Sequence, residues 1–275
     1  MDKHNKQIEL KELQDITFSI LKEVVEFCDS NDIRYFLCGG TLLGAIRHKG
    51  FIPWDGDIDI AMPRPDYSRF ELLYSKKGKY KCTSLNVNNN NCFFSIARVS
   101  NENTEIIYHD FPSAPRIGIH IDIFPIDGLN DDLKKSVRHI NKQKFYLMLI
   151  NNSFKPIFHK RKNWMKTIFA PFISILSRII ITKKTMYAML HKIEREAQQC
   201  CFDTSKYVTR TGSQYKFWLP REVYNASIDV EFEGELLKAP AGYHEYLTTL
   251  YGAYMIPPPT KDQKPGQFKA YWIKG

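Results

Sequence analysis

The spacing of apolar residues predicts helices and strands that alternate through the first half of the chain. An amphipathic helix is expected over residues 9–30, because apolar positions there follow a three-to-four spacing. These positions are Leu13, Ile16, Ile20, Val24 and Phe27. Further helices are expected at 41–48 and 65–74, and strands at 34–38, 57–62, 80–85, 92–99 and 117–124. This alternation is typical of an α/β arrangement.

The second half is predicted to be helical first and mixed at its end. Residues 131–200 are expected to form helices, with breaks at Pro156 and Pro171. Three elements are expected afterwards: a hairpin over 227–237 turning at Glu233-Gly234, a helix from Pro240 to about 251, and a loop-like tail over 257–275. We therefore predict an α/β (α+β) fold with a mixed β-sheet, divided into a core at 1–130, a helical insert at 131–200 and a C-terminal return at 201–275.

Charge is distributed unevenly between this insert and the rest of the chain. The whole chain carries a formal charge of +9, yet residues 133–193 contain 14 basic residues and no Asp or Glu. The remainder holds 25 basic and 30 acidic residues, a net charge of −5. Such asymmetry predicts a polyanionic partner for the insert, which could be a membrane surface, a nucleic acid or a phosphate-rich substrate.

Cysteine usage and the N-terminus favour a protein of the cytoplasm. The six cysteines include no C-x-x-C pair, so reduced thiols are expected, with a disulfide or a structural zinc as the alternative. Residues 1–14 are highly charged and lack the pattern of a secretory signal.

Two aspartates on one predicted strand are the first candidates for chemistry. Asp57 and Asp59 are two residues apart, so both should face one side of the strand, where their charges repel unless a cation lies between them. The pattern favours a Mg²⁺ site, with Mn²⁺ as a substitute, over a pair of solvated acids. Asp122, between Ile121 and Ile123, is a candidate third carboxylate, and His120 should share its strand face.

A glycine pair lies just before these aspartates. Gly39 and Gly40 are expected between a strand and a helix, where backbone N–H groups, together with Thr41, can hold a phosphate. Arg47 and His48 end that helix and could either reach a diphosphate or neutralise the helix C-terminus.

These residues together resemble the nucleotidyltransferase fold and, within it, the LicD family. The resemblance is carried by residues 40–55, the Asp57-Ile58-Asp59 pair, and the stretches 64–67, 120–128, 232–234, 246–247 and 250–255. Two positions depart from the family pattern: Gly56 replaces an acid of the usual W-D-D-D-I-D run, and Ala253 replaces an Asp.

The resemblance implies transfer of a phospho-alcohol from a CDP-activated donor to a glycan hydroxyl, with release of CMP. Phosphocholine from CDP-choline is the expected case, and ribitol phosphate or glycerol phosphate the alternatives. Asp57, Asp59 and Asp122 are then expected to hold the metal, Asp122 or His120 to accept the acceptor's proton, and Arg47 to stabilise CMP. Trp54 is a candidate for choline recognition, as are Tyr67, Trp218, Tyr251 and Tyr254.

Other functions are weighed against this expectation. A true nucleotidyltransferase would release pyrophosphate instead of CMP, and a non-enzymatic membrane- or polyanion-binding protein would need only the insert. No recognised nucleic-acid motif is present, and the clustered acids argue against nucleic acid at that face.

The basic insert contains an apolar stretch over residues 164–181. A membrane span is one interpretation, but Lys166, Pro171 and Arg178 interrupt it. A core helical pair and a basic amphipathic surface on the inner membrane leaflet are the others. We expect the last, with a lipid-linked glycan acceptor and a peripheral position on the inner membrane face.

Overall fold

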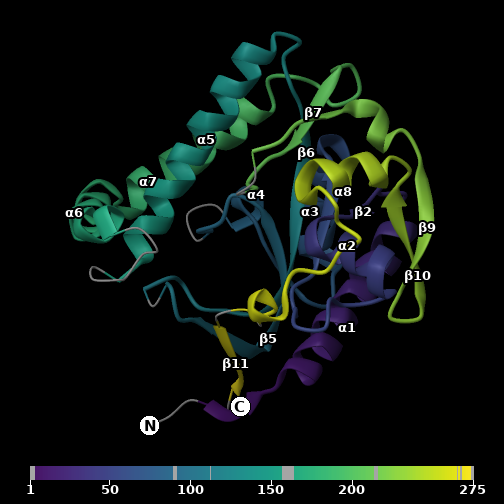
Figure 1. Cartoon of the computed structure of the whole chain (residues 1–275), viewed down its shortest axis with the longest axis horizontal. Helices are drawn as coiled ribbons and strands as arrows, with labels where there is room; N and C mark the ends of the chain where they lie inside the picture. Colours follow the sequence, from purple (N-terminus) through teal and green to yellow (C-terminus); the bar gives the residue numbers. More distant parts are fainter. Residues whose placement is uncertain are drawn as a thin grey trace.

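A mixed β-sheet forms the centre of the protein in the computed structural model, which describes residues 4–88, 92–111, 113–156, 164–213, 216–264, 266 and 268–273 (Figure 1). Its main path runs through β1 (His4–Ile8), β11 (Phe268–Ile273), β5 (Ala97–Tyr108), β6 (Ile117–Gly128), β3 (Asp59–Pro63) and β2 (Phe36–Leu37). Three short strands join it: β4 (Lys81–Thr83), β7 (Tyr207–Arg210) and β8 (Leu219–Pro220). The predicted α+β class with a mixed sheet is confirmed.

The register of this sheet positions the candidate chemistry. Strands β3 and β6 are parallel, and Asp59 lies opposite Asp122. Strand β5 runs antiparallel on the other side of β6 and places Arg98 opposite Asp122. Three charged side chains from three distant segments therefore meet in one row across the sheet.

Helices and a separate hairpin surround the sheet. They are α1 (Leu10–Ser30), α2 (Gly39–His48), α3 (Arg64–Lys77), α4 (Leu85–Asn88), α8 (Tyr243–Tyr251), the short 3₁₀ helices at Arg221–Tyr224 and Thr260–Asp262, and a hairpin of β9 (Ser227–Phe232) and β10 (Glu235–Pro240). The apolar residues of α1 recur every three to four positions because one face of the helix is buried. Ile20, Leu21 and Val24 on that face are inaccessible to solvent in the main core. Burying such side chains contributes roughly 1.5–3 kcal/mol each.

The residues after β6 form a helical arm beside the sheet (Figure 1). It consists of α5 (Leu133–Phe154), α6 (Trp164–Ile180) and α7 (Lys183–Ala197). Helix α5 begins with Asp132, whose carboxylate accepts from the N–H groups of Lys134 and Lys135, and α7 begins with a capping box at Thr182 and Thr185. A small apolar cluster joins the arm to α4 and includes Leu85, Ile150 and Leu190.

A buried ion network fastens this arm to the core. The guanidinium of Arg64 donates to both carboxylate oxygens of Asp127, at 2.6 and 2.7 Å, and also to Glu194 of α7. Arg64 lies over the ring of Tyr67, and Asp66 accepts from Arg34. The Arg-Pro-Asp-Tyr stretch at residues 64–67 thus begins α3 and connects it to its neighbours.

The turn of the β9–β10 hairpin braces the C-terminal end of α2. Glu233 and Gly234 both have positive φ, and the Glu233 carboxylate accepts from the backbone N–H of Phe51. The N–H of Glu233 donates to the carbonyl of Lys49. Gly50 leaves room for the Glu233 carboxylate, since an added Cβ would lie 2.2 Å from Glu233 Oε1 and displace it. The late Phe-Glu-Gly motif therefore supports the loop that leads to the aspartates.

The structure differs from the sequence-based expectations in several elements. The tail is not all loop, because residues 268–273 form β11, which pairs with both β1 and β5. Pro171 lies inside α6 and does not break it, whereas α5 does end just before Pro156. The expected strand at 92–99 begins only at Ala97, β7 was not expected, and the expected turn at 86–91 lies partly outside the described residues.

The structure also bears on the state of the cysteines and on the interpretation of a membrane span. All six cysteines are free thiols, as expected. Among the helices whose residues are described, none is long and apolar enough to cross a membrane.

Candidate functional site

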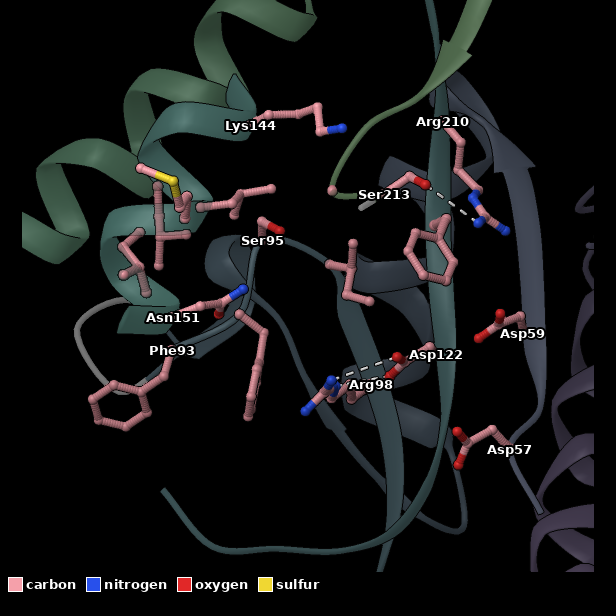
Figure 2. Close-up of a pocket in the computed structure, with 18 of the residues that line it drawn as sticks. Asp57, Asp59, Phe93, Ser95, Arg98, Asp122, Lys144, Asn151, Arg210 and Ser213 are labelled. Atoms are coloured by element: carbon pink, nitrogen blue, oxygen red, sulfur yellow. Dashed lines mark hydrogen bonds and ion pairs between the residues drawn. The ribbon is translucent and has the colours of Figure 1, made fainter. Parts of the chain in front are cut away.

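A cavity of about 590 Å³ lies between the sheet and the helical arm. Asp57, Asp59 and Asp122 line one side of it (Figure 2). Lys144 and Asn151 of α5 line the other side. Helix α5 presents these two residues to the same cavity because they are two helical turns apart. The basic arm is thus one wall of the candidate site.

Neither the Asp57 nor the Asp59 carboxylate forms an ion pair within the described part of the chain, although the nearby charge of Arg210 acts to lower the pKa of Asp59. Asp59 begins β3, and its backbone N–H donates to Thr41 Oγ1 at 2.8 Å. Asp57 comes just before the strand and is accessible to solvent. Surrounding protein displaces water from one side of Asp57, and Asp55, Asp59 and Asp122 add negative charge, which raises its pKa to about 8. Burial likewise raises the pKa of Asp59.

Asp122 is in a different situation because it already has a cationic partner. Arg98 Nε donates to Asp122 Oδ1 at 2.8 Å, and Arg98 Nη2 lies 3.4 Å from Oδ2. The Arg98 guanidinium also lies 3.8 Å from the ring centroid of Phe94. The predicted roles of Asp122 as third metal ligand and proton acceptor therefore stay predictions, and Arg98 contacts both of its carboxylate oxygens in this structure.

The donor set fits Mg²⁺ with two protein carboxylates. No group of three His, Cys, Asp or Glu side chains in the described residues is close enough to enclose a metal ion. Mg²⁺ commonly binds one or two carboxylates together with substrate phosphates and water, so a complete protein cage is not required. The observation that supports this fit is that neither Asp57 nor Asp59 has an ion-pair partner among the described residues, while burial and neighbouring carboxylates raise the pKa of both.

The glycine pair allows the start of α2 to approach these carboxylates. Gly39 has φ of +58°, and a Cβ there would lie 2.6 Å from Asp59 Oδ2. A Cβ at Gly40 would lie 3.3 Å from Asp55 Oδ2. The Gly39 N–H donates to the hydroxyl of Tyr246 at 2.9 Å, so this group already has a partner. The predicted phosphate cradle of Gly39, Gly40 and Thr41 stays a prediction.

Arg210 is a cation that sequence reasoning missed. It projects from β7, with its guanidinium 4.2 Å from the ring centroid of Phe124, and lines the same cavity (Figure 2). Its Nη1 donates to Cys38 Sγ at 2.9 Å and lies 3.3 Å from Tyr246 Oη. Its Nε is buried without a partner among the described residues. Arg210 thus connects the C-terminal return to the turn that carries Gly39.

Arg98 and Lys144 were also missed. Arg98 lies between the apolar residues Ala97 and Val99, and a charge in that setting is a usable signal for a buried partner. No signal in the sequence distinguished Lys144 from the other lysines of the insert, or the buried Arg210 from the other arginines of the chain. Their place in the site depends on pairings between segments far apart in the chain.

His120 lies next to Asp122, as its strand position predicted. His120 Nδ1 is 2.8 Å from the carbonyl oxygen of Gly118, which can only accept, so Nδ1 carries the proton. Burial and the nearby Arg98 lower the pKa of His120 to about 4. His120 is therefore neutral near pH 7 and a weak base, and it does not line the cavity.

Arg47, His48 and Trp54 do not reach the cavity. Arg47 Nε donates to His48 Nε2, and Arg47 Nη1 donates to the carbonyl of Tyr254 at 3.0 Å. Both basic side chains thus lie at the far end of α2, where they meet the C-terminal segment. Trp54 is half-buried against the main core. The aromatic residues that do line the cavity are Phe93, Phe94 and Phe124.

Removing the Asp57 charge is expected to flatten the pH dependence of stability. The folded state holds the Asp57 proton more tightly than the unfolded state, so this group's contribution to stability falls as pH rises from about 4 to about 8. Asp57→Asn cannot titrate, and its melting temperature should fall less than that of the unaltered chain between about pH 6 and pH 9 in EDTA. Mg²⁺ should raise the melting temperature of the unaltered chain only. Parallel pH curves for the two proteins would contradict this.

Comparisons with known proteins identify the family of this chain. Residues 32–146 match the family model described as "LicD/FKTN/FKRP, nucleotidyltransferase domain". The chain is 30% identical over 270 residues to the lipopolysaccharide cholinephosphotransferase LicD of Haemophilus influenzae, covering 98% of this chain and 99% of that protein. A 50-residue stretch is 44% identical to the human ribitol 5-phosphate transferase FKRP, covering 18% of this chain and 10% of that protein. With its cavity of paired aspartates and its similarity to LicD over nearly its whole length, this chain belongs to the LicD family.

Proposed function

We propose that this protein transfers phosphocholine from CDP-choline to a sugar hydroxyl of a cell-surface glycan precursor, releasing CMP. The observation that carries the proposal is the similarity to the Haemophilus cholinephosphotransferase over nearly the full length of both chains. The cavity supports it because its lining combines carboxylates for a metal with cations for phosphates. A volume of about 590 Å³ is in the range of sites for ligands of this size.

Asp57 and Asp59 are the residues that would hold Mg²⁺ in this proposal. A bound Mg²⁺ supplies positive charge to the diphosphate and to the leaving CMP. Thr41 maintains the position of Asp59 through the hydrogen bond to its backbone N–H. Asp59 begins β3, whose following residues are buried, and Asp57 comes just before it, so both carboxylates are held beside the cavity before the donor binds.

Three cations are placed to bind the diphosphate. Arg98, Arg210 and Lys144 come from the sheet, the C-terminal return and the arm, and all line the cavity. We propose that Arg98 moves from Asp122 to a phosphate oxygen when the donor binds. Asp122 then accepts the proton of the acceptor hydroxyl, whose oxygen bonds to the choline-bearing phosphorus while the bridging P–O bond breaks and CMP leaves.

Product analysis with a panel of donors tests this function. The protein is incubated with Mg²⁺, a glycan acceptor and CDP-choline, CDP-ribitol or CDP-glycerol, and CMP and the modified glycan are measured. The expected result is CMP formation that is fastest with CDP-choline and is abolished by EDTA. Pyrophosphate formation from CTP in place of CMP release would instead identify a nucleotidyltransferase, and no turnover with any donor would contradict the proposal.

Ribitol phosphate transfer is the second candidate because of the local 44% identity to FKRP. That identity covers only 50 residues. A preference for CDP-ribitol in the donor panel would support this candidate and leave the shared chemistry unchanged.

A further inference from the structure

Helix α6 has an inverted distribution of polar and apolar residues. Its large apolar side chains at Phe172, Ile175, Leu176 and Ile179 are exposed, with 72% of Phe172 and 70% of Ile179 accessible. Their spacing of three, one and three residues places them on one helix face. We call these four residues the α6 apolar face.

On the opposite side of α6, two serine side chains are buried. Ser174 and Ser177 are inaccessible to solvent, and neither hydroxyl has a hydrogen-bond partner among the described residues. Arg178 Nη2 donates to the carbonyl of Lys155, which fastens α6 to the end of α5. The helix is therefore held with its apolar face outward, although turning it would bury apolar area.

A contiguous exposed apolar face is a mark of an interaction surface. The charges around it identify the partner. Residues 133–193 contain no acidic residue, and Arg178, Lys183 and Lys184 are exposed beside the C-terminal end of α6. Apolar side chains flanked by cations match a bilayer surface with anionic headgroups.

We infer that the α6 apolar face docks on an anionic membrane surface. The four apolar side chains enter the boundary between headgroups and acyl chains, and the flanking cations contact lipid phosphates. The helix lies in the plane of the membrane, because α6 is too short and too closely attached to α5 to cross it. The cavity is formed partly by α5 of the same arm, so docking would bring the site to the membrane surface.

Vesicle flotation of the full chain tests this inference at physiological salt. The protein should float with vesicles of phosphatidylcholine and phosphatidylglycerol and remain unbound with phosphatidylcholine alone. The Phe172→Ser/Ile179→Ser variant should bind at least about tenfold more weakly. Both side chains are exposed, so circular dichroism and melting temperature should stay unchanged.

The chain offers a matched control. Leu236 and Ile256 are 69% and 72% exposed and lie outside the arm, so Leu236→Ser/Ile256→Ser should retain full vesicle binding. The inference would be overturned if both double variants lost vesicle binding equally, or if the unaltered chain did not bind the vesicles.

A second copy of the chain is the competing occupant of the face. If light scattering shows a dimer that Phe172→Ser/Ile179→Ser dissociates, while vesicles stay unbound, the face is a dimer interface and the membrane assignment is wrong. CMP release with a water-soluble acceptor should be unchanged in this variant. A failure of docking is thereby distinguished from a failure of the proposed transferase activity.

Discussion

Asp59→Asn is expected to lower kcat by about 10³-fold or more, because one of the two cavity carboxylates that have no ion-pair partner in the described structure is lost. The carboxamide has the same shape, and the hydrogen bond from the backbone N–H of residue 59 to Thr41 is retained. Asparagine cannot supply the negative charge that a metal requires, so the metal-dependent part of the rate should disappear. The measurement is the rate of CMP release at saturating donor and Mg²⁺.

The melting temperature of Asp59→Asn should not fall with its kcat. Burial raises the pKa of Asp59, which means that its ionised form is unfavourable in the metal-free fold. Asp59→Asn should therefore melt at or above the temperature of the unaltered chain in EDTA. Asp15→Asn, on the exposed side of α1, is the control and should leave both quantities unchanged. A kcat within tenfold of the unaltered chain would show that Asp59 is not in the catalytic machinery.

Arg64→Met is expected to destabilise the protein by about 3–5 kcal/mol, because it leaves two buried carboxylates without their cation. Asp127 and Glu194 both accept from Arg64, and all three side chains are almost fully buried. Denaturant unfolding followed by circular dichroism measures the effect. Arg64→Lys should recover only part of it, since an ammonium group cannot make the paired hydrogen bonds that the guanidinium makes to Asp127.

A surface ion pair provides the matched control for Arg64. Lys238 contacts Asp229 at 2.7 Å, but both side chains are about half exposed. Lys238→Met should change the free energy of unfolding by less than about 1 kcal/mol. If Arg64→Met and Lys238→Met were equally mild, the ion network would not be what holds the arm to the core.

Sequence patterns predicted secondary structure best where the residues that form an element are close together in the chain. Helix α1 follows from its apolar spacing, and the β9–β10 turn follows from Glu233-Gly234, where φ is positive at both residues. The neighbouring positions of Asp57 and Asp59 place both beside one cavity, even though Asp57 lies just outside β3. These features depend on interactions over a few residues, which local patterns record.

The sequence predicted poorly where a strand depends on a distant partner. β1 and β11 come from opposite ends of the chain and pair with each other. Few of their side chains are buried, so the spacing of apolar residues did not predict these two strands. The same limitation applies to Arg47 and His48, because the direction in which a helix end points depends on what packs against it.

The sequence by itself determined the family resemblance, the paired carboxylates and the separate basic arm. Each of these features follows from residues that are close together in the chain or from the composition of one segment. Only the tertiary structure decided that Arg98 pairs with Asp122, that Arg210 and Lys144 reach the same cavity, and that α6 turns its apolar face outward. Those features arise from strand register and helix packing between distant segments. Such contacts are set by the free energy of the whole fold and leave no local pattern.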